Sequence, residues 1–304
     1  MSWKFFPAFN YNFDKYSLFI KWIMEAAFRI QNIFRRHIAL PQDHGSWVFL
    51  LSPLSIGLFA GGRWSLAAGY LILAALAAFL IRQPVTMAVK AHTGRRARRD
   101  LPAAYFWSAV YGALGLLALA GLVLQGFGYL LYLALPGIPV FIWHLYLISQ
   151  RAERRQMGIE MVGSGVLALA APAALWVGLE RPDPMGWLLF GLVWLQSAAS
   201  IVYAYLRLAQ RALPVLPDVP ARLQMGRRAL LYTSFNLLAV AALSSSGILP
   251  PLLPLPYALQ WLETLRGVLK PALGVKPTAI GIRQLIVSTL FTLLFILTWR
   301  IMNG

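Results

Sequence analysis

The sequence contains no cysteine, and this absence excludes disulfide bonds, thiolate metal ligands and catalysis by a thiol nucleophile. Acidic residues are scarce, because 10 Asp and Glu stand against 27 Lys and Arg and leave a net charge of +17 at pH 7. Charged residues make up only 12% of the 304 residues, whereas hydrophobic residues make up 59%. So few charged side chains cannot cover so much apolar surface in water. The composition therefore excludes a soluble globule and predicts a membrane protein.

Long apolar runs take the place of charge in this sequence. A helix needs about 20 largely apolar residues to cross a hydrocarbon layer of about 30 Å. Nine stretches meet this requirement, so we predict an all-α, polytopic membrane helix bundle over residues 40–304. The stretches are 45–61, 64–81, 102–124, 127–149, 160–179, 187–206, 229–247, 251–269 and 284–302.

The eighth stretch is the weakest of the nine. Glu263 and Arg266 lie near its far end. Its start lacks backbone hydrogen-bond donors because of four prolines, Pro250, Pro251, Pro254 and Pro256. A broken helix is the alternative to a full span here.

Basic residues alternate between the predicted loops. All Lys and Arg residues except Arg63, Arg181 and Arg300 fall on the side that holds the N-terminal segment and the loops after the second, fourth, sixth and eighth spans. The positive-inside rule places that side, and with it the N-terminus, in the cytoplasm. We therefore expect a multi-pass protein of the cell membrane whose basic face meets anionic lipids rather than nucleic acid.

Residues 1–39 form an N-terminal segment of a different kind. Apolar residues recur at helical spacing from Tyr16 to Arg36, with charged residues on the opposite face. This pattern predicts an amphipathic helix that lies in the membrane interface. The alternative is a helix that packs on partner subunits of a membrane complex or on the protein's own loops. The segment lacks the basic start and apolar run of a cleavable signal peptide.

Several polar clusters lie at the predicted helix ends, and the topology places them all on the cytoplasmic side. Each cluster alone is explained by helix capping, interfacial anchoring or the positive-inside rule. Together they predict one cytoplasm-facing pocket that binds an anion, because Arg, Lys, Gln and Thr donate hydrogen bonds to oxyanions. The candidate ligand-binding residues are His44, Arg82, Gln83, Glu160, Lys276, Thr278, Arg283 and Gln284.

Two of these candidates, His44 and Glu160, are not required by the topology. Ionisable groups beside membrane helices usually face a cavity or a partner, so we expect Glu160 to form a salt bridge. Pro84 and Pro277 are expected to break the backbone at two clusters that are loosely alike. This likeness is too weak to establish an internal repeat.

Polar residues within the spans have two interpretations. They either line a cavity or form hydrogen bonds between helices, and they are His144, Gln196, Ser197, Ser200 and Asn236. The four histidines of the chain have no ligand spacing, so no metal site is predicted and no cofactor can be named.

Three motifs resemble those of the YwiC-like membrane protein family. They are His44-Gly45-Ser46-Trp47 at the first span, Arg82-Gln83-Pro84 after the second, and Lys276-Pro277-Thr278 through Gly281-Ile282-Arg283-Gln284 before the last. The resemblance covers the chain from about Leu40 to its end. It implies a topology and a set of polar residues, but no reaction.

A more distant resemblance is to the UbiA-type prenyltransferases. It implies nine helices, a cytoplasmic N-terminus and a polar pocket that opens to the cytoplasm. Those enzymes bind diphosphate through Mg²⁺ held by Asp-rich motifs in two loops, where this sequence has only Asp100 and Asp218. Two isolated carboxylates do not make two Mg²⁺ sites. The resemblance therefore implies an arrangement of helices without the metal-dependent chemistry.

The sequence is compatible with three functions. In the first, the pocket binds an anionic lipid or isoprenoid-like ligand, and His44 or Glu160 is the acid or base if the protein is an enzyme. In the second, the protein transports a small anion through a site between the eighth span and the start of the ninth. In the third, it is an accessory subunit of a larger membrane complex and docks through its N-terminal helix.

Overall fold

The structure is a computed structural model that describes residues 34–41, 44–152 and 156–303, and every regular element within them is a helix. Most of the amphipathic helix predicted from Tyr16 to Arg36, up to residue 33, lies outside the described residues, as does the side chain of His44. The elements are α2 (Arg36–Ala39), η1 (His44–Trp47), α3 (Val48–Gly61), α4 (Leu66–His92), η2 (Arg98–Asp100), α5 (Leu101–Leu124), η3 (Gly128–Leu130), α6 (Leu131–Ala134), α7 (Gly137–Ser149), α8 (Met157–Ala168), α9 (Ala170–Leu179), α10 (Pro184–Gln210), α11 (Val219–Ser245), α12 (Pro254–Leu269) and α13 (Pro277–Asn303).

Six helical segments in the described part of the chain are long and apolar enough to cross a membrane. They are Leu66–His92, Arg98–Leu124, Gly128–Ser149, Met157–Leu179, Pro184–Gln210 and Pro277–Ile301, and a shorter apolar helix spans Gly45–Gly61. These segments confirm the prediction of an all-α, multi-pass membrane protein. The remaining two predicted stretches fall in α11 and α12, so the number of nine spans stays a prediction.

Helix α11 differs from the six long apolar segments in its charge, and helix α12 differs from them in its length. The first three turns of α11 contain Arg222, Arg227 and Arg228. Helix α12 begins at Pro254 and has 16 residues. At 1.5 Å per residue it is about 24 Å long, which is less than the hydrocarbon thickness of about 30 Å. The proline-rich segment before α12 therefore shortens the eighth predicted span.

Proline affects the other helices in two ways. The prediction that the backbone breaks at Pro84 is wrong, because α4 continues through this residue to His92. One missing N–H is tolerated there, since α4 packs along α5. In contrast, α8 ends at Ala168, whose carbonyl would need the N–H that Pro172 lacks. Pro277 occupies the first position of α13, where an N–H is not required.

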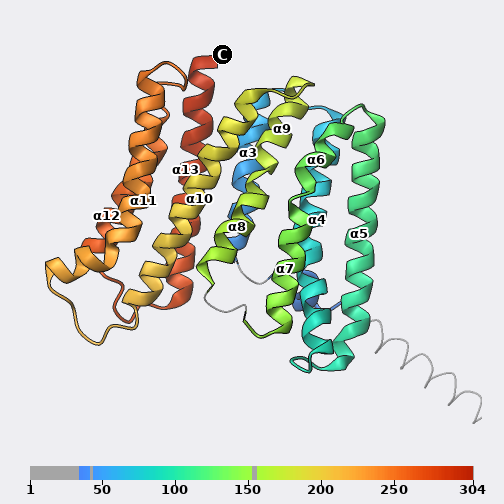
Figure 1. Cartoon of the computed structure of the whole chain (residues 1–304), viewed down its shortest axis with the longest axis horizontal. Coiled ribbons are helices and arrows are strands. Elements are labelled where there is room, and N and C mark those ends of the chain that lie inside the picture. Colours follow the sequence, from blue (N-terminus) through green and yellow to red (C-terminus); the bar gives the residue numbers. More distant parts are fainter. Residues whose placement is uncertain (1–33, 42–43, 153–155, 304) are drawn as a thin grey trace, which may run out of the picture.

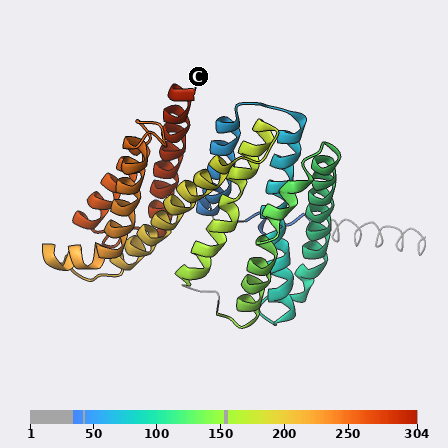
Figure 2. The same ribbon diagram turned by 45° about the horizontal axis from the view of Figure 1, so that its top comes forward.

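The helices form a bundle in which three groups lie side by side (Figure 1). Helices α4, α5 and α7 pack together at one side, and α11, α12 and α13 lie at the other. Helices α3, α8 and α9 lie between them. Figure 2 shows α10 running obliquely from the middle group toward α11–α13, and it packs against α8, α9, α11 and α13. Helix α10 therefore joins the middle of the bundle to the C-terminal helices.

The connections α4–α5, α7–α8, α10–α11 and α12–α13 all lie at one end of the bundle (Figure 1). We call this the basic end, because these connections contain Arg95, Arg151, Arg211 and Lys276. At the opposite end Arg63 pairs with Glu180 at 3.2 Å. The structure thus gathers at one end the loops that the sequence analysis assigned to one side of the membrane.

A buried carboxylate fixes the segment before η1 to the basic end. The Asp100 side chain, only 7% exposed, accepts a hydrogen bond from Arg35 at 2.7 Å and lies 3.8 Å from Arg96. Ile38 in α2 is fully buried between α4 and α5. Tyr111 donates a hydrogen bond to the carbonyl of Ala39. The last residues of the predicted N-terminal segment are therefore part of the helix bundle.

Replacing Asp100 by Ala is expected to release this segment. The change removes charge-assisted hydrogen bonds, which contribute about 1.5–3 kcal/mol each when they are buried. Since the chain has no cysteine, an Ile38→Cys variant offers a single thiol that maleimide reaches only after release. Labelling should be at least several-fold faster with Asp100→Ala. Asp218→Ala is the matched control, because the Asp218 side chain caps only its own helix. Equal labelling rates with and without Asp100→Ala would contradict this role.

Candidate functional site

An ion pair between α12 and α13 lies inside the helix bundle. The guanidinium of Arg283 donates to both carboxylate oxygens of Glu263, with Nε–Oε1 and Nη2–Oε2 distances of 2.5 and 2.6 Å. The Glu263 side chain is 10% exposed, whereas that of Arg283 is 41% exposed. A bidentate arrangement of this kind is the strongest form of an Arg–carboxylate contact. The carboxylate is thus buried, and the guanidinium reaches it from a more open position.

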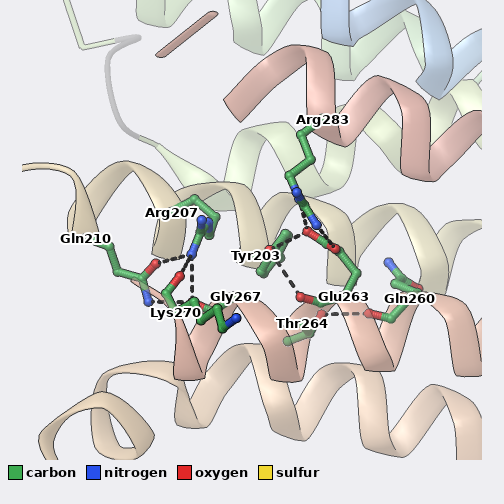
Figure 3. A network of polar contacts seen from close by, with 9 residues as sticks. All are labelled: Tyr203, Arg207, Gln210, Gln260, Glu263, Thr264, Gly267, Lys270 and Arg283. Carbon is green, nitrogen blue, oxygen red and sulfur yellow. Dashed lines mark hydrogen bonds and ion pairs between the residues drawn. The ribbon is translucent and has the colours of Figure 1, made fainter. Parts of the chain in front are cut away.

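Helix α10 completes this site with a tyrosine and a backbone carbonyl. The hydroxyl of Tyr203 donates to Oε1 of Glu263 at 2.9 Å. The side-chain amide of Gln284 donates to the carbonyl of Ser200 at 2.6 Å. Figure 3 shows Arg283, Glu263 and Tyr203 converging from three helices. The contacts therefore connect α10, α12 and α13 at one level of the bundle.

A small cavity of about 20 Å³ adjoins the ion pair. A cavity needs a volume of about 10–15 Å³ to hold one buried water molecule, so this cavity has room for about one. Most of its surface is apolar, although seven of the eight lining residues have a polar side chain; the lining comprises Ser200, Tyr203, Gln260, Glu263, Thr264, Gln284, Val287 and Ser288. The Gln260 amide donates to the carbonyl of Gln196 at 3.1 Å and to the Ser200 hydroxyl at 3.0 Å.

Helical spacing explains why these side chains share one level. Residues three or four positions apart lie on the same face of a helix. On α10 this relation connects Gln196, Ser200 and Tyr203. On α12 it connects Gln260 with Glu263 and Thr264, and on α13 it connects Gln284 with Ser288. Each helix thus contributes one short polar stripe to the site.

A second polar network continues from Tyr203 toward the basic end (Figure 3). Arg207 Nη1 donates to the carbonyls of Gly267 and Lys270 at 2.7 and 2.8 Å, and to Oε1 of Gln210. The last carbonyls of a helix have no partner within it and carry partial negative charge. Arg207 therefore stabilises the end of α12 and holds the helix that carries Glu263.

The structure places the eight predicted site residues in several settings. Arg283 and Gln284 belong to the site between α10, α12 and α13. Lys276 and Thr278 are exposed at the start of α13. The carboxylate of Glu160 in α8 accepts a hydrogen bond from the Tyr205 hydroxyl at 2.8 Å.

Arg82 and Gln83 lie on α4, in the region that faces α2 and η1. The Arg82 guanidinium is 5.7 Å from the ring centre of Phe79, and Phe79 also contacts Trp47 of η1. Gln83 donates to the carbonyl of His37 at 2.9 Å. The helix η1, which begins at His44, packs against α3 and α13. One pocket for all eight residues stays a prediction.

Sequence reasoning missed three central residues of the site, namely Tyr203, Gln260 and Glu263. Glu263 was noted only as a weakness of the eighth span. A single acidic residue in an apolar stretch, with Arg283 near the start of the next one, was the signal that could have found it. Tyr203 and Gln260 carried no separate signal, because such residues also occur at helix interfaces without a site.

The candidate metal ligands of the described residues do not cluster. Among these residues, no group of three or more His, Asp or Glu side chains could hold a metal ion. The acidic residue of the α10–α12–α13 site is held by Arg283 and Tyr203. This donor set does not fit a divalent cation, which takes several carboxylate or carbonyl ligands.

Comparison with known proteins finds a similarity in the first part of the bundle. A family model described as YwiC-like protein matches residues 40–175, which are less than half of the chain. The chain is also similar to uncharacterized protein YwiC of Bacillus subtilis (strain 168), with 26% identity over 167 residues. That alignment covers 54% of this chain and 62% of the YwiC protein, which is less than two thirds of its length. No solved structure matches the chain.

The YwiC-like match covers η1, α3 to α8 and part of α9, and it ends at Leu175. Arg82, Gln83 and Glu160 lie within it, whereas the polar site on α10, α12 and α13 lies beyond it. The resemblance to UbiA-type prenyltransferases stays a prediction. The polar site is therefore interpreted from its own geometry.

Proposed function

We propose that this integral membrane protein transports a small anion through the site between α10, α12 and α13, and that its basic end faces the cytoplasm. The observation that carries the proposal is the Glu263–Arg283 ion pair, which Tyr203 joins from a third helix. Charged groups within membrane helices cost several kcal/mol each and concentrate along the pathways of substrates and ions. A pair of this kind thus indicates a pathway more strongly than surface charges do.

The chemistry of Arg283 favours an anionic substrate. Its guanidinium already binds two carboxylate oxygens in a planar fork. A small carboxylate, or one face of a phosphate, presents the same pair of oxygens. Such an anion can replace Glu263 on Arg283 and preserve both charge-assisted hydrogen bonds of the guanidinium, while Glu263 retains the hydrogen bond from Tyr203. The 41% exposure of the Arg283 side chain supports access for this exchange.

The shape of the site favours a small anion. The enclosed cavity beside Glu263 is about 20 Å³ and has no room for an isoprenoid diphosphate, so an anion on Arg283 would bind at the exposed side of the guanidinium. Short or interrupted helices commonly form the binding sites of secondary transporters. Helix α12, with its proline-rich start and 16 residues, is such an element.

Anion uptake into liposomes tests the proposal. We expect purified protein to accelerate the uptake of at least one labelled probe anion among phosphate, sulfate and lactate. The variant Arg283→Gln should lower that uptake by a factor of about 10 or more, because a bidentate charge-assisted contact contributes more than 1.4 kcal/mol.

Arg300→Gln is the matched control for this experiment. Arg300 is also on α13, but its guanidinium lies over the ring of Phe59, at 5.1 Å from its centre, and it does not belong to the site. This variant should keep wild-type uptake. Uptake no faster than in protein-free liposomes for every probe would contradict transport. If anionic lipid alone then raised the melting temperature, a lipid-binding function would be favoured instead.

A further inference from the structure

The two members of the Glu263–Arg283 ion pair differ in their surroundings. The Glu263 side chain is 10% exposed, whereas the Arg283 side chain is 41% exposed. Most of the surface of the small cavity beside Glu263 is apolar. The long arginine side chain can extend toward water and keep its charge, but the shorter glutamate stays buried on α12. An anion that draws Arg283 away therefore leaves the carboxylate behind.

Two side chains stabilise the Glu263 carboxylate. Arg283 donates hydrogen bonds to both of its oxygens, and the Tyr203 hydroxyl donates one to Oε1. Of the two, only Arg283 carries a positive charge. A hydroxyl can donate to a carboxylate and also to the carbonyl oxygen of a neutral carboxyl group. The contact with Tyr203 is therefore compatible with both protonation states of Glu263, whereas the contact with Arg283 requires the ionised state.

No second cation contacts Glu263 among the described residues. Helices α10, α11 and α13 pack against α12. On α10, the guanidinium of Arg207 lies 6.0 Å from the centre of the Tyr203 ring and is held by carbonyls at the end of α12. The other charged or titratable side chains of α11 and α12 bind backbone carbonyls or are exposed, and they are Arg222, Arg227, Arg228, Tyr232, Tyr257 and Arg266. Arg283 is thus the cation that balances the charge of Glu263.

We propose that Glu263 binds a proton when a substrate anion replaces it on Arg283, so that the protein moves one proton together with each anion. This proposal rests on the anion transport proposed above. Without Arg283 the carboxylate is a buried negative charge with one neutral donor, and burial favours the neutral form of a carboxyl group. The proton binds to a carboxylate oxygen and leaves again when the anion departs and Arg283 returns.

This exchange keeps the net charge of the site constant. Before it, the charges of Glu263 and Arg283 cancel. After it, a singly charged anion pairs with Arg283 while Glu263 is neutral. An unbalanced charge between membrane helices is costly, and carboxylates within them commonly relay protons. Proton binding by Glu263 therefore avoids an unbalanced charge in both states, and the balance holds for a singly charged anion such as a small monocarboxylate.

Proton binding is tested on the purified, full-length protein in detergent, without an anion gradient. Arg283→Met removes the cation and places Glu263 in the state that binds a proton. We expect this variant to gain melting temperature relative to the wild type as the pH falls from about 8 to about 5, because its folded form binds a proton more tightly than the unfolded chain does. About half or more of its deficit at the higher pH should disappear.

Two double variants are the matched controls. Arg283→Met with Glu263→Gln lacks the group that titrates and should show no such gain. Arg283→Met with Glu180→Gln should keep the gain, since Glu180 pairs with Arg63 at the opposite end of the bundle and its side chain is 62% exposed. If Arg283→Met kept its whole deficit at low pH, Glu263 would stay ionised without its cation, and the proton site would be refuted.

Uptake into liposomes tests the coupling in the wild-type protein. A pH gradient with the acidic side outside should accelerate the uptake of the transported probe anion at least several-fold, after subtraction of the uptake into protein-free liposomes. A pH-sensitive dye inside the liposomes should record proton entry together with the anion. With Glu263→Gln the gradient should no longer change the rate of uptake, whereas with Glu180→Gln it should accelerate uptake as in the wild type.

The coupling and the proposed transport can fail separately. Anion uptake that does not respond to the pH gradient would retain transport and refute the coupling. Proton binding by Arg283→Met without uptake of any probe would contradict transport and coupling, and would leave Glu263 as a proton-binding group. If Arg283→Met does not fold, the gradient experiment on the wild type decides the coupling.

Discussion

Replacing Arg283 by Met is expected to destabilise the protein far more than replacing Glu263 by Gln. Loss of Arg283 leaves a carboxylate that is only 10% exposed, with Tyr203 as its remaining described hydrogen-bond donor. Removing one partner of a buried ion pair costs about 3–5 kcal/mol, and the partial exposure of this pair favours the lower value. Loss of the Glu263 charge leaves an arginine that is already 41% exposed and can extend toward water. We expect that change to cost about 1 kcal/mol.

Thermal unfolding in detergent, measured in choline chloride, gives these differences. The double variant with Met at both positions should recover most of the stability that Arg283→Met loses. Replacing both charges of a buried pair by apolar side chains is often neutral or stabilising, because it removes the desolvation cost of both. The stated asymmetry is refuted if Glu263→Gln costs as much as Arg283→Met. A pair that contributes only on the surface would give two small and similar losses.

Replacing Gly57 or Gly178 by Ala is expected to separate α3 from α9. A Cβ atom at Gly57 would lie 2.3 Å from the carbonyl oxygen of Ala171, and one at Gly178 would lie 2.6 Å from the Cα atom of Gly61. Both obstacles are backbone atoms, so no side-chain rotation can relieve the contact. Small residues let membrane helices approach closely, and their packing supplies the attraction that water supplies in soluble proteins. Overpacking costs about 1–3 kcal/mol, and a backbone clash places these variants at the upper end.

Gly163→Ala is the control for this packing. Gly163 lies in α8, and a Cβ atom there would have nothing within 4 Å. Alanine in that helix should stabilise it by about 0.5–1 kcal/mol, since glycine loses more backbone entropy. The melting temperatures of the two groups should therefore move in opposite directions. If Gly57→Ala melted at or above the wild-type temperature, the close approach of α3 and α9 would not contribute to stability.

These two predictions concern residues that lie differently with respect to the YwiC-like match over residues 40–175. Gly57 and Ala171 both lie within residues 40–175, whereas Gly178 lies just beyond them. Glu263 and Arg283 lie outside it. The Gly57 variant thus tests a contact within the matched residues, whereas the ion-pair test examines the C-terminal helices of this chain.

The sequence by itself determined the class of the protein and the position of most helices. Apolar runs such as 102–124 and 187–206 fall within α5 and α10, because a membrane requires long apolar helices whatever their neighbours are. It also identified proline-containing segments where helices begin, since Pro254 begins α12 and Pro277 begins α13. It failed at Pro84, where packing along α5 maintains a helix that local propensity disfavours.

Only the tertiary structure decided which polar side chains meet. The sequence named Arg283 and Gln284 but did not name Glu263, with which the structure pairs Arg283. The salt bridge expected for Glu160 stays a prediction. Helical spacing fixes which residues share a face of one helix, so the stripe from Gln196 to Tyr203 was available in the sequence. The order and rotation of neighbouring helices are set by close packing at positions such as Gly57 and Gly178. The pattern along one chain does not contain that information, because any of several polar helix faces could have met the face of α13.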